Sequence, residues 1–402
     1  MWGPVLDNAS SRVVTTRACD ERSTAWKSGD DVQQREHVRS HQHQRRRPKD
    51  YAVCAEVHLF DGSGGHMNHH PSRRNFLAGI AGFGASVLFQ NRPGRIDVHH
   101  HFGSPQWISM TNTKKTQGYQ TWQPYTPARA IEDMDRGGVS TSLISITTPG
   151  IWFGNLEETR GLARRENEYG AKMVSDYKSR FGLFAVLPLP DVDASLREIE
   201  YAFDTLKAEG VGLLSNWGDK WLGDASFKPV LDELNRRKAI IYTHGAAPGC
   251  CGGSFVPNVP ETTIEYNTDV SRTIVSLISS GTANRTPDIR YILSHGGGTI
   301  TALTGRFLGN EATAENLAGT PQANSRLYHL RRFFYDTAAS TNPVNIQSLK
   351  MLVGASQIVF GTDHPFGNSA NIAAALQKVG LTSDELRGVD RENALRMLPK
   401  YR

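Results

Sequence analysis

Three consecutive histidines end a short apolar run close to residue 100. In an extended strand over 96–101, successive side chains point to opposite faces, so His99 and His101 share one face and His100 lies on the other. Two imidazoles on one face at a strand end are typical of two ligands to one metal ion. A solvated, histidine-rich loop is the alternative. We predict that His99 and His101 bind a metal and that His100 does not.

Three later apolar runs also end in residues that can bind a metal or transfer a proton. These residues are His244, His295 and Asp363. Three imidazoles and one carboxylate leave a further coordination position for water or substrate, as a catalytic metal requires. We therefore predict one metal ion whose ligands are His99, His101, His244 and Asp363.

His295 is predicted to stand beside this metal as a general acid or base, and Asp363 to share the catalytic role. The three glycines that follow His295 would let a substrate approach the backbone closely. For any single histidine, a buried side chain with a satisfied hydrogen bond is the alternative. His364 is expected to be a wall or structural residue.

These residues require a scaffold that brings several strand ends together. Short β-rich runs alternate with segments of helical periodicity, and the runs cover 96–101, 142–147, 182–187, 211–215, 239–244, 289–295, 333–337 and 358–363. The helical segments cover 127–135, 156–177, 194–207, 227–237, 262–280, 343–352 and 383–398. Such alternation implies parallel strands with crossover helices, and eight units predict an α/β fold, the (β/α)8 TIM barrel. A doubly wound sheet is the alternative, but no Gly-rich phosphate loop follows an early strand.

The sequence favours one metal ion over two. The fourth run ends in Ser215 and Asn216, and it supplies no Lys or Glu that would bridge a second metal. No GxSxG nucleophile elbow stands out either. We therefore expect mononuclear metal chemistry rather than two-metal or serine chemistry.

Composition fits a folded enzyme without a nucleic-acid partner. The 402 residues are 38% hydrophobic and 21% charged, and the formal net charge is only +5. No basic patch with interleaved aromatic residues marks the predicted barrel. The four cysteines include an adjacent pair, Cys250 and Cys251, and form no CxxC motif, so a disulfide framework or a cysteine zinc site is not expected.

The first ninety residues differ from the rest. Residues 1–66 are polar and carry a basic run, which predicts disorder or an over-extended start. Residues 67–92 contain Arg73 and Arg74 before an uncharged apolar stretch and resemble a twin-arginine export signal. We expect periplasmic export, with an uncleaved membrane-contacting anchor or a cytoplasmic location as alternatives. The barrel is expected to span 93–402.

The strand-end motifs carry a family resemblance over about residues 95–400. The motif IDVHxH at 96–101, SHGGG at 294–298 and GTDHPF at 361–366 resemble the amidohydrolase-superfamily branch of non-oxidative decarboxylases. This branch includes the aminocarboxymuconate semialdehyde, γ-resorcylate and 6-methylsalicylate decarboxylases, and the layout is most similar to the last. The segments 181–191 and 133–139 add to the resemblance.

The resemblance implies a cofactor, a partner and further site residues. It implies one divalent ion, usually zinc and sometimes manganese, held by the four ligands predicted above, and it makes His295 the proton shuttle. It also implies a homodimer. Arg306 follows His295 by eleven residues, where the muconate enzyme has an arginine that binds substrate carboxylate. A solvated helix arginine is the alternative. The aminocarboxymuconate substrate itself is not expected, because the segment before the first helix is short and differently composed.

We hypothesise decarboxylation of an ortho-hydroxy aromatic, salicylate-type acid. Trp152 and Phe153 after the second run and Trp217 after the fourth would form an apolar wall for a planar ring, although plain loop packing also explains them. A mononuclear metal-dependent hydrolase of an amide, lactone or ester is the runner-up, because the same ligands activate water. A non-catalytic periplasmic binding barrel is a third possibility.

Overall fold

The computed structural model describes residues 94–249 and 256–402. The polar segment 1–66 and the signal segment 67–92 therefore lie outside the described residues, as do Cys250 and Cys251. The domain boundaries, the export signal and the cysteine environment predicted above all remain predictions.

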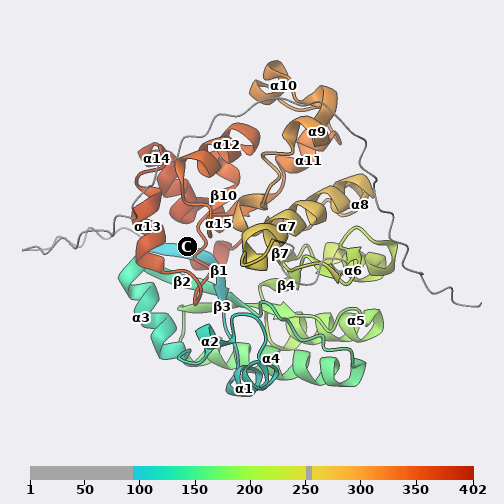
Figure 1. Ribbon diagram of the computed structural model, residues 1–402, viewed down its shortest axis with the longest axis vertical. Helices are drawn as coiled ribbons and strands as arrows, with labels where there is room; N and C mark the ends of the chain where they lie inside the picture. The colour runs from blue at the N-terminus through green and yellow to red at the C-terminus, as the bar shows by residue number, and fades with distance from the viewer. Residues whose placement is uncertain (1–93, 250–255) are drawn as a thin grey trace, which may run out of the picture. The chain divides into compact units, whose positions relative to one another are not determined.

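Eight parallel strands form the centre of the fold (Figure 1). Their order in the sheet is the order of the chain, and they comprise β1 Arg95–His101, β2 Val139–Ser145, β3 Phe181–Val186, β4 Gly210–Leu214, β7 Ile240–His244, β8 Arg290–Leu293, β9 Phe334–Asp336 and β10 Ile358–Val359. A short antiparallel pair, β5 Asn216–Trp217 and β6 Lys220–Trp221, follows β4.

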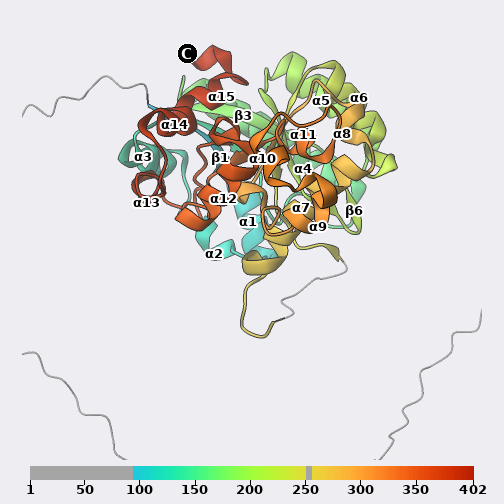
Figure 2. The ribbon, with the colours of Figure 1, turned by 90° about the horizontal axis from the view of Figure 1, so that it is seen from above.

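Helices surround the strands, as the two ribbon views show (Figure 1, Figure 2). They comprise α1 Pro105–Lys114, α2 Tyr119–Trp122, α3 Pro127–Gly137, α4 Leu156–Asp176, α5 Val192–Glu200, α6 Lys228–Arg236, α7 Glu261–Ser279, α8 Thr282–Arg285, α9 Thr304–Leu308, α10 Ala314–Ala318, α11 Arg326–Leu330, α12 Pro343–Val353, α13 Ser369–Leu376, α14 Ser383–Arg387 and α15 Asn393–Leu395. The predicted last helix is broken by a π turn between α14 and α15. No helical segment was predicted for α1, α2, α8, α13 or the short helices between β8 and β9, most of which have only one or two turns.

The sheet closes between β1 and the chain that follows β10. The amide of Val98 donates to the carbonyl of Phe360 at 3.0 Å, and that of His101 donates to the carbonyl of His364 at 2.8 Å. His100 and His364 also form a parallel bridge. This closure confirms the predicted TIM barrel, in which the C-terminal strand ends surround one mouth.

A bulge in β1 determines which histidines face the barrel interior. The register with β2 shifts between Asp97 and His100, so that an advance of three residues along β1 corresponds to an advance of two residues along β2. Val98 belongs to an apolar cluster with Tyr242, and the adjacent His99 ring also lies 5.1 Å from that tyrosine ring. The bulge therefore turns Val98 and His99 inward in succession, and His100 points outward.

Two of the predicted strands end before the candidate site residue that each was expected to carry. β8 stops at Leu293, and β10 covers only Ile358–Val359. His295 and Asp363 lie beyond the strands with φ of 54° and 62°, in the left-handed region. β8 thus ends two residues before His295 and β10 ends four residues before Asp363. This correction places both side chains on the loops at the barrel mouth rather than on the strands.

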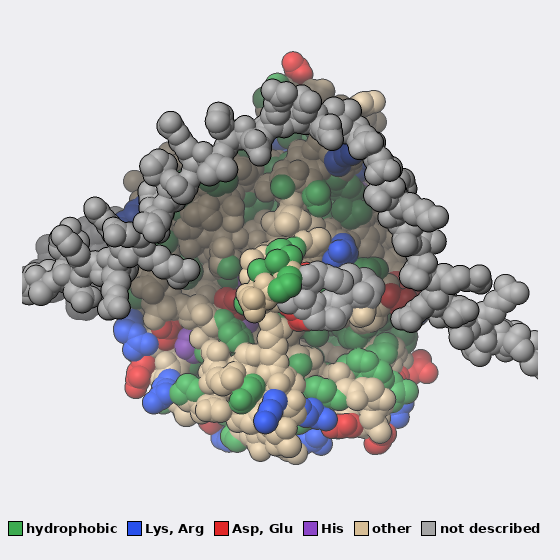
Figure 3. Space-filling view, in the orientation of Figure 1, with side chains coloured by type: hydrophobic (Ala, Val, Ile, Leu, Met, Phe, Trp, Pro, Cys, Tyr) green, Lys and Arg blue, Asp and Glu red, His purple; other side chains and the backbone are tan. Residues whose placement is uncertain are grey.

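The outer layers pack closely, and α3 lies beside α13 in both ribbon views (Figure 1, Figure 2). Gly137 is required there, because a Cβ atom at this position would lie 2.4 Å from the Cβ of Ser369. On the face shown in Figure 3, Lys and Arg side chains are scattered among other types. No helix in the described residues combines the length and apolar character that a membrane span requires.

Candidate metal centre

The four predicted metal ligands come together at the barrel mouth. The ligand atoms of His99, His101, His244 and Asp363 all lie within 4.8 Å of one another. Asp363 Oδ1 is 3.2 Å from His99 Nε2, 3.1 Å from His101 Nε2 and 3.8 Å from His244 Nε2. The three histidines are buried, whereas the Asp363 side chain is 18% exposed. One side of the cluster is thus open toward solvent.

The outer nitrogens of the ligand imidazoles face hydrogen-bond acceptors. His99 Nδ1 lies 2.8 Å from Asp336 Oδ2, and His244 Nδ1 lies 2.8 Å from the carbonyl of Gly245. His101 Nδ1 is 3.3 Å from both the carbonyl and the hydroxyl of Ser145. These acceptors favour the tautomer that carries its proton on Nδ1, which leaves the Nε2 lone pairs directed at the centre.

Such a cluster needs a cation at its centre. Three nitrogen lone pairs and a carboxylate oxygen face one another, and the buried His244 Nε2 and Asp363 Oδ1 make no hydrogen bond of normal geometry. Acceptors this close repel unless a positive charge lies among them. A His3Asp donor set is suited to a divalent ion such as zinc or manganese. The residues present therefore fit the expected metal.

The carboxylates make the centre attractive to positive charge. Burial alone would lower the pKa of His99, but Asp336 and Asp363 outweigh it and raise the pKa of His99 to about 10. Burial would raise the pKa of Asp363, whereas the imidazoles, His99 foremost, hold that pKa well below its ordinary value. Without a metal the centre therefore holds a proton on His99, and a bound ion takes its place.

His295 stands beside the cluster without joining it. Its ring centroid lies 5.0 Å from that of His99 and 5.1 Å from that of His244. Burial lowers the pKa of His295 to about 4, the nearby imidazoles add to the effect and the Asp363 carboxylate opposes it. His295 is therefore a neutral imidazole at pH 7, in reach of a molecule that binds at the centre and able to accept a proton.

The sequence matches the amidohydrolase family over residues 96–400. The chain belongs to this family. It is also similar to the decarboxylase yanB of Aspergillus niger, with 33% identity over 76% of this chain and 88% of that one. It is similar as well to the 6-methylsalicylic acid decarboxylase of Penicillium expansum, with 31% identity over 77% of this chain and 97% of that one. The resemblance to the decarboxylase branch is thereby confirmed.

One solved structure shares the fold of this amidohydrolase-family chain. It is a dihydroxybenzoic acid decarboxylase from Polaromonas sp. JS666 with bound manganese and the inhibitor 2-nitroresorcinol. The TM-score is 0.66 at 18% identity, and the match covers 77% of this chain and 98% of that one. The comparison supports the barrel architecture.

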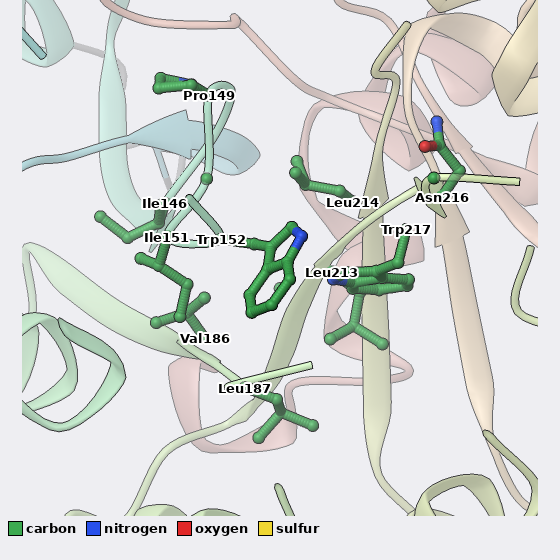
Figure 4. Close-up of a pocket in the computed structure, with 13 residues that line it drawn as sticks. Ile146, Pro149, Ile151, Trp152, Val186, Leu187, Leu213, Leu214, Asn216 and Trp217 are labelled. Atoms are coloured by element: carbon green, nitrogen blue, oxygen red, sulfur yellow. The ribbon is translucent and has the colours of Figure 1, made fainter. Parts of the chain in front are cut away.

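Two of the predicted wall residues of this amidohydrolase-family chain line a common pocket. The pocket lies at the ends of β2, β3 and β4, and Trp152 and Trp217 both border it (Figure 4). Phe153 is not among its lining residues, because its ring lies under the ammonium group of Lys114 at 4.9 Å. The structure therefore brings the two tryptophans together and places Phe153 elsewhere.

Arg306 lies on α9, and its side chain is exposed. No ion pair or hydrogen bond joins it to the described residues. The described barrel thus leaves the guanidinium available to solvent or to a second copy of the chain. The predicted carboxylate-binding role remains a prediction.

The sequence analysis missed Asp336, which is fully buried at the end of β9. Its Oδ2 meets His99 Nδ1, and its Oδ1 accepts hydrogen bonds from the amides of His295 and Ala338 at 2.9 and 3.0 Å. One carboxylate thus positions a metal ligand and the backbone of the candidate acid–base residue. The sequence did contain a signal for this role, because Asp336 is an acidic residue near the end of the seventh apolar run.

His100 and His364 form a separate layer behind the ligands. Their rings stack with centroids 4.4 Å apart, and His100 Nδ1 lies 3.1 Å from Asp97 Oδ2. His364 Nδ1 lies 3.4 Å from Asp133 Oδ2. Both imidazoles therefore brace the closure of β1 against the chain after β10, as expected of residues outside the ligand set.

Proposed function

We propose that this protein is a metal-dependent, non-oxidative decarboxylase of a hydroxy-aromatic, salicylate-type carboxylic acid. The observation that carries the proposal is the His3Asp cluster with a neutral His295 beside it and an aromatic-lined pocket at the same barrel mouth. The similarity to 6-methylsalicylic acid decarboxylase supports the same chemistry. The runner-up is metal-dependent hydrolysis, which the same ligands would support; the relatives at 33% and 31% identity are both named decarboxylases and favour decarboxylation.

The metal ion would be held by His99, His101, His244 and Asp363. When bound, it supplies a positive charge that stabilises negative charge developing on the substrate oxygens. Zinc is the expected ion, and manganese is the alternative that the Polaromonas enzyme supports. The protein fixes the ligand geometry through Asp336 and Ser145, so the imidazoles need not reorganise during the reaction.

The protein's own residues would manage one proton. Decarboxylation breaks the bond between the ring carbon and the carboxylate, the bonding electrons remain on the ring, and a proton takes the place of the departing CO2. His295 is neutral and can take up a proton from the substrate hydroxyl or from water. His295 then delivers it to the ring carbon directly or through Asp363. Trp152 and Trp217 would exclude water from the ring faces.

The test uses salicylate-type acids carrying 13C in the carboxyl group. We expect the metal-loaded protein to release labelled CO2 and one equivalent of the matching phenol. A product that forms without CO2 and carries a new carboxylate or amine would establish the hydrolase instead. Full function with His295→Ala would establish a binding barrel.

We also propose export by the twin-arginine route and assembly as a homodimer. The support for export is the sequence of residues 67–92, and the support for a dimer is the exposed Arg306, which has no partner within the described barrel. Fractionation of a bacterial host that expresses the full chain tests the first, with an Arg73→Lys, Arg74→Lys variant as the control. Sedimentation of the purified chain tests the second.

A further inference from the structure

A buried carboxylate outside the metal centre organises one side of the pocket. Asp269 on α7 is fully buried, and three side chains from the segment that follows β4 and contains β5 and β6 donate to it. These donors are the hydroxyl of Ser215, Nδ2 of Asn216 at 2.6 Å and Nε1 of Trp221 at 2.8 Å. Such charge-assisted bonds hold the loop in one arrangement. The reaction proposed above makes no use of Asp269.

This arrangement fixes the orientation of the Asn216 amide. Asn216 Nδ2 also donates to the carbonyl of Ala246 at 3.2 Å, so both of its hydrogens face acceptors. The opposite amide orientation would turn Oδ1 toward two acceptors. Oδ1 is therefore the remaining polar atom, and no described residue donates to it. Asn216 lines the pocket beside Trp217, across from Trp152 (Figure 4).

The pocket shares its wall with the metal centre. Leu214 lines the pocket and pairs in register with the ligand His244. Gly212 also lines it, and a Cβ atom there would lie 2.9 Å from Cβ of Ser145, whose hydroxyl faces His101. The pocket is therefore a neighbour of the metal centre along β4, and a ring bound at the metal enters it only if the ring extends toward β4.

The other side chains that line the pocket are apolar or tryptophan. Among the described lining residues, Asn216 alone carries a side-chain hydrogen-bond acceptor. An acceptor in apolar surroundings favours a ligand group that donates a hydrogen bond, and it disfavours an anionic carboxylate or an apolar methyl group. The pocket is thus built to distinguish a ring hydroxyl from a methyl group of similar size.

We infer that Asn216 is a specificity-determining residue that selects aromatic acids with a second ring hydroxyl, and that Asp269 positions its amide for this purpose. The inference rests on the proposed function and refines the substrate class. The hydroxyl in question is additional to the one next to the carboxylate, and it donates its proton to Asn216 Oδ1.

The first experiment compares matched acids on the metal-loaded full chain. Salicylic acids with either a hydroxyl or a methyl group at each of ring positions 3 to 6 differ little in size. We expect kcat/KM at one position to favour the hydroxyl about three- to tenfold, as one neutral hydrogen bond allows. Asn216→Leu should remove that preference, and Asn216→Ala provides a second test if the leucine variant folds poorly. A preference at no position, or one unchanged in both variants, would overturn the inference.

The second experiment tests the positioning role. In Asp269→Asn the new carbonyl can still accept from Trp221, which leaves the new amide group to face Asn216. Asn216 should then turn Oδ1 toward it and present Nδ2 to the pocket. We expect the hydroxyl-to-methyl preference to disappear, whereas a merely structural role would lower activity toward both acids equally. A preference that persists in the folded variant would contradict the positioning role.

Equilibrium binding separates this inference from the proposed function. Calorimetry with the same acid pairs measures the preference without turnover. Hydroxyl-selective binding that depends on Asn216, without release of CO2 from any acid, would refute the decarboxylase proposal and support the pocket assignment. Release of CO2 without hydroxyl-selective binding would support the decarboxylase proposal and refute the assignment of the pocket.

Discussion

Asp336 Oδ2 lies 2.8 Å from Nδ1 of His99, and both side chains are fully buried. This pair fixes the ring of a ligand whose other nitrogen faces the metal position. Because the same carboxylate also holds the amide of His295, the position of the metal ligand and that of the acid–base residue depend on one side chain.

Replacement of Asp336 should weaken metal binding more than it weakens the fold. Asp336→Asn can retain an acceptor for the backbone amides, but it places an N–H group opposite His99 Nδ1. Loss of such an outer partner typically lowers metal affinity about 10- to 100-fold. Competition with a chelator measures the affinity, and thermal unfolding checks the fold. Unchanged metal affinity would show that Asp336 has no part in the site.

His295 should be needed for turnover and not for the metal. Because it lies outside the ligand cluster, His295→Asn should retain the metal and lose about 10²- to 10⁴-fold in kcat, the usual contribution of a general acid or base. The matched control is His329→Asn, which removes a buried histidine that bonds Asn284 on the outer layer. Equal activity of the two variants would reject the catalytic role.

Metal removal should abolish activity, and metal uptake should release a proton. With the pKa of His99 near 10, the metal-free centre is protonated at pH 7, and the ion must displace that proton. Metal affinity should therefore rise about tenfold for each pH unit between 6 and 8. Titration with zinc and with manganese in two buffers of different ionisation enthalpy measures the proton release. Affinity independent of pH would contradict a protonated His99.

Acid should weaken the contact between α3 and α13. Burial alone would raise the pKa of Asp133, but hydrogen bonds from His364 and Ser369 outweigh it and hold the pKa well below its ordinary value. The stabilisation is therefore present above about pH 4 and is lost as the pH falls toward the folded-state pKa. Asp133→Asn should lower the free energy of unfolding at pH 7. Below pH 4 the free energy of unfolding should fall less steeply in this variant than in the unchanged protein, and the two slopes should differ by up to about 1.4 kcal/mol per pH unit.

Urea-induced unfolding at several pH values measures the free energy of unfolding of the Asp133 variant. Asp135→Asn serves as the control, because Asp135 lies on the same helix and its side chain is 63% exposed. If both variants show the same pH profile as the unchanged protein, the hydrogen bonds of Asp133 contribute nothing to acid stability.

The cluster of candidate ligands could be predicted from the sequence because each of its residues lies at the end of an apolar run. A TIM barrel brings the C-terminal ends of its strands together, irrespective of the conformation of the loops. The residues at or just beyond these ends include His99, His101, His244 and Asp363. The barrel itself followed from the alternation of strands and helices, which is a local property of the chain.

Other features depend on tertiary contacts that no local pattern encodes. The bulge at Asp97–His100 appears only in the pairing with β2, and the left-handed backbone of His295 and Asp363 lies beyond the ends of β8 and β10. The roles of Asp336 and Asp269 depend on partners between about 40 and 240 residues away in the chain. Short helices such as α9 and α10 lack a periodicity long enough to detect.

We expect this metal site to replace a carboxylate on an aromatic ring with a proton. The most direct measurement is turnover of a carboxyl-labelled salicylate-type acid in D2O, with CO2 and the phenol analysed together. We predict one labelled CO2 for each phenol, one deuterium at the former carboxyl position, and loss of both on chelation or in His295→Asn. A product without CO2, or a phenol without deuterium at that carbon, would rule out this decarboxylation.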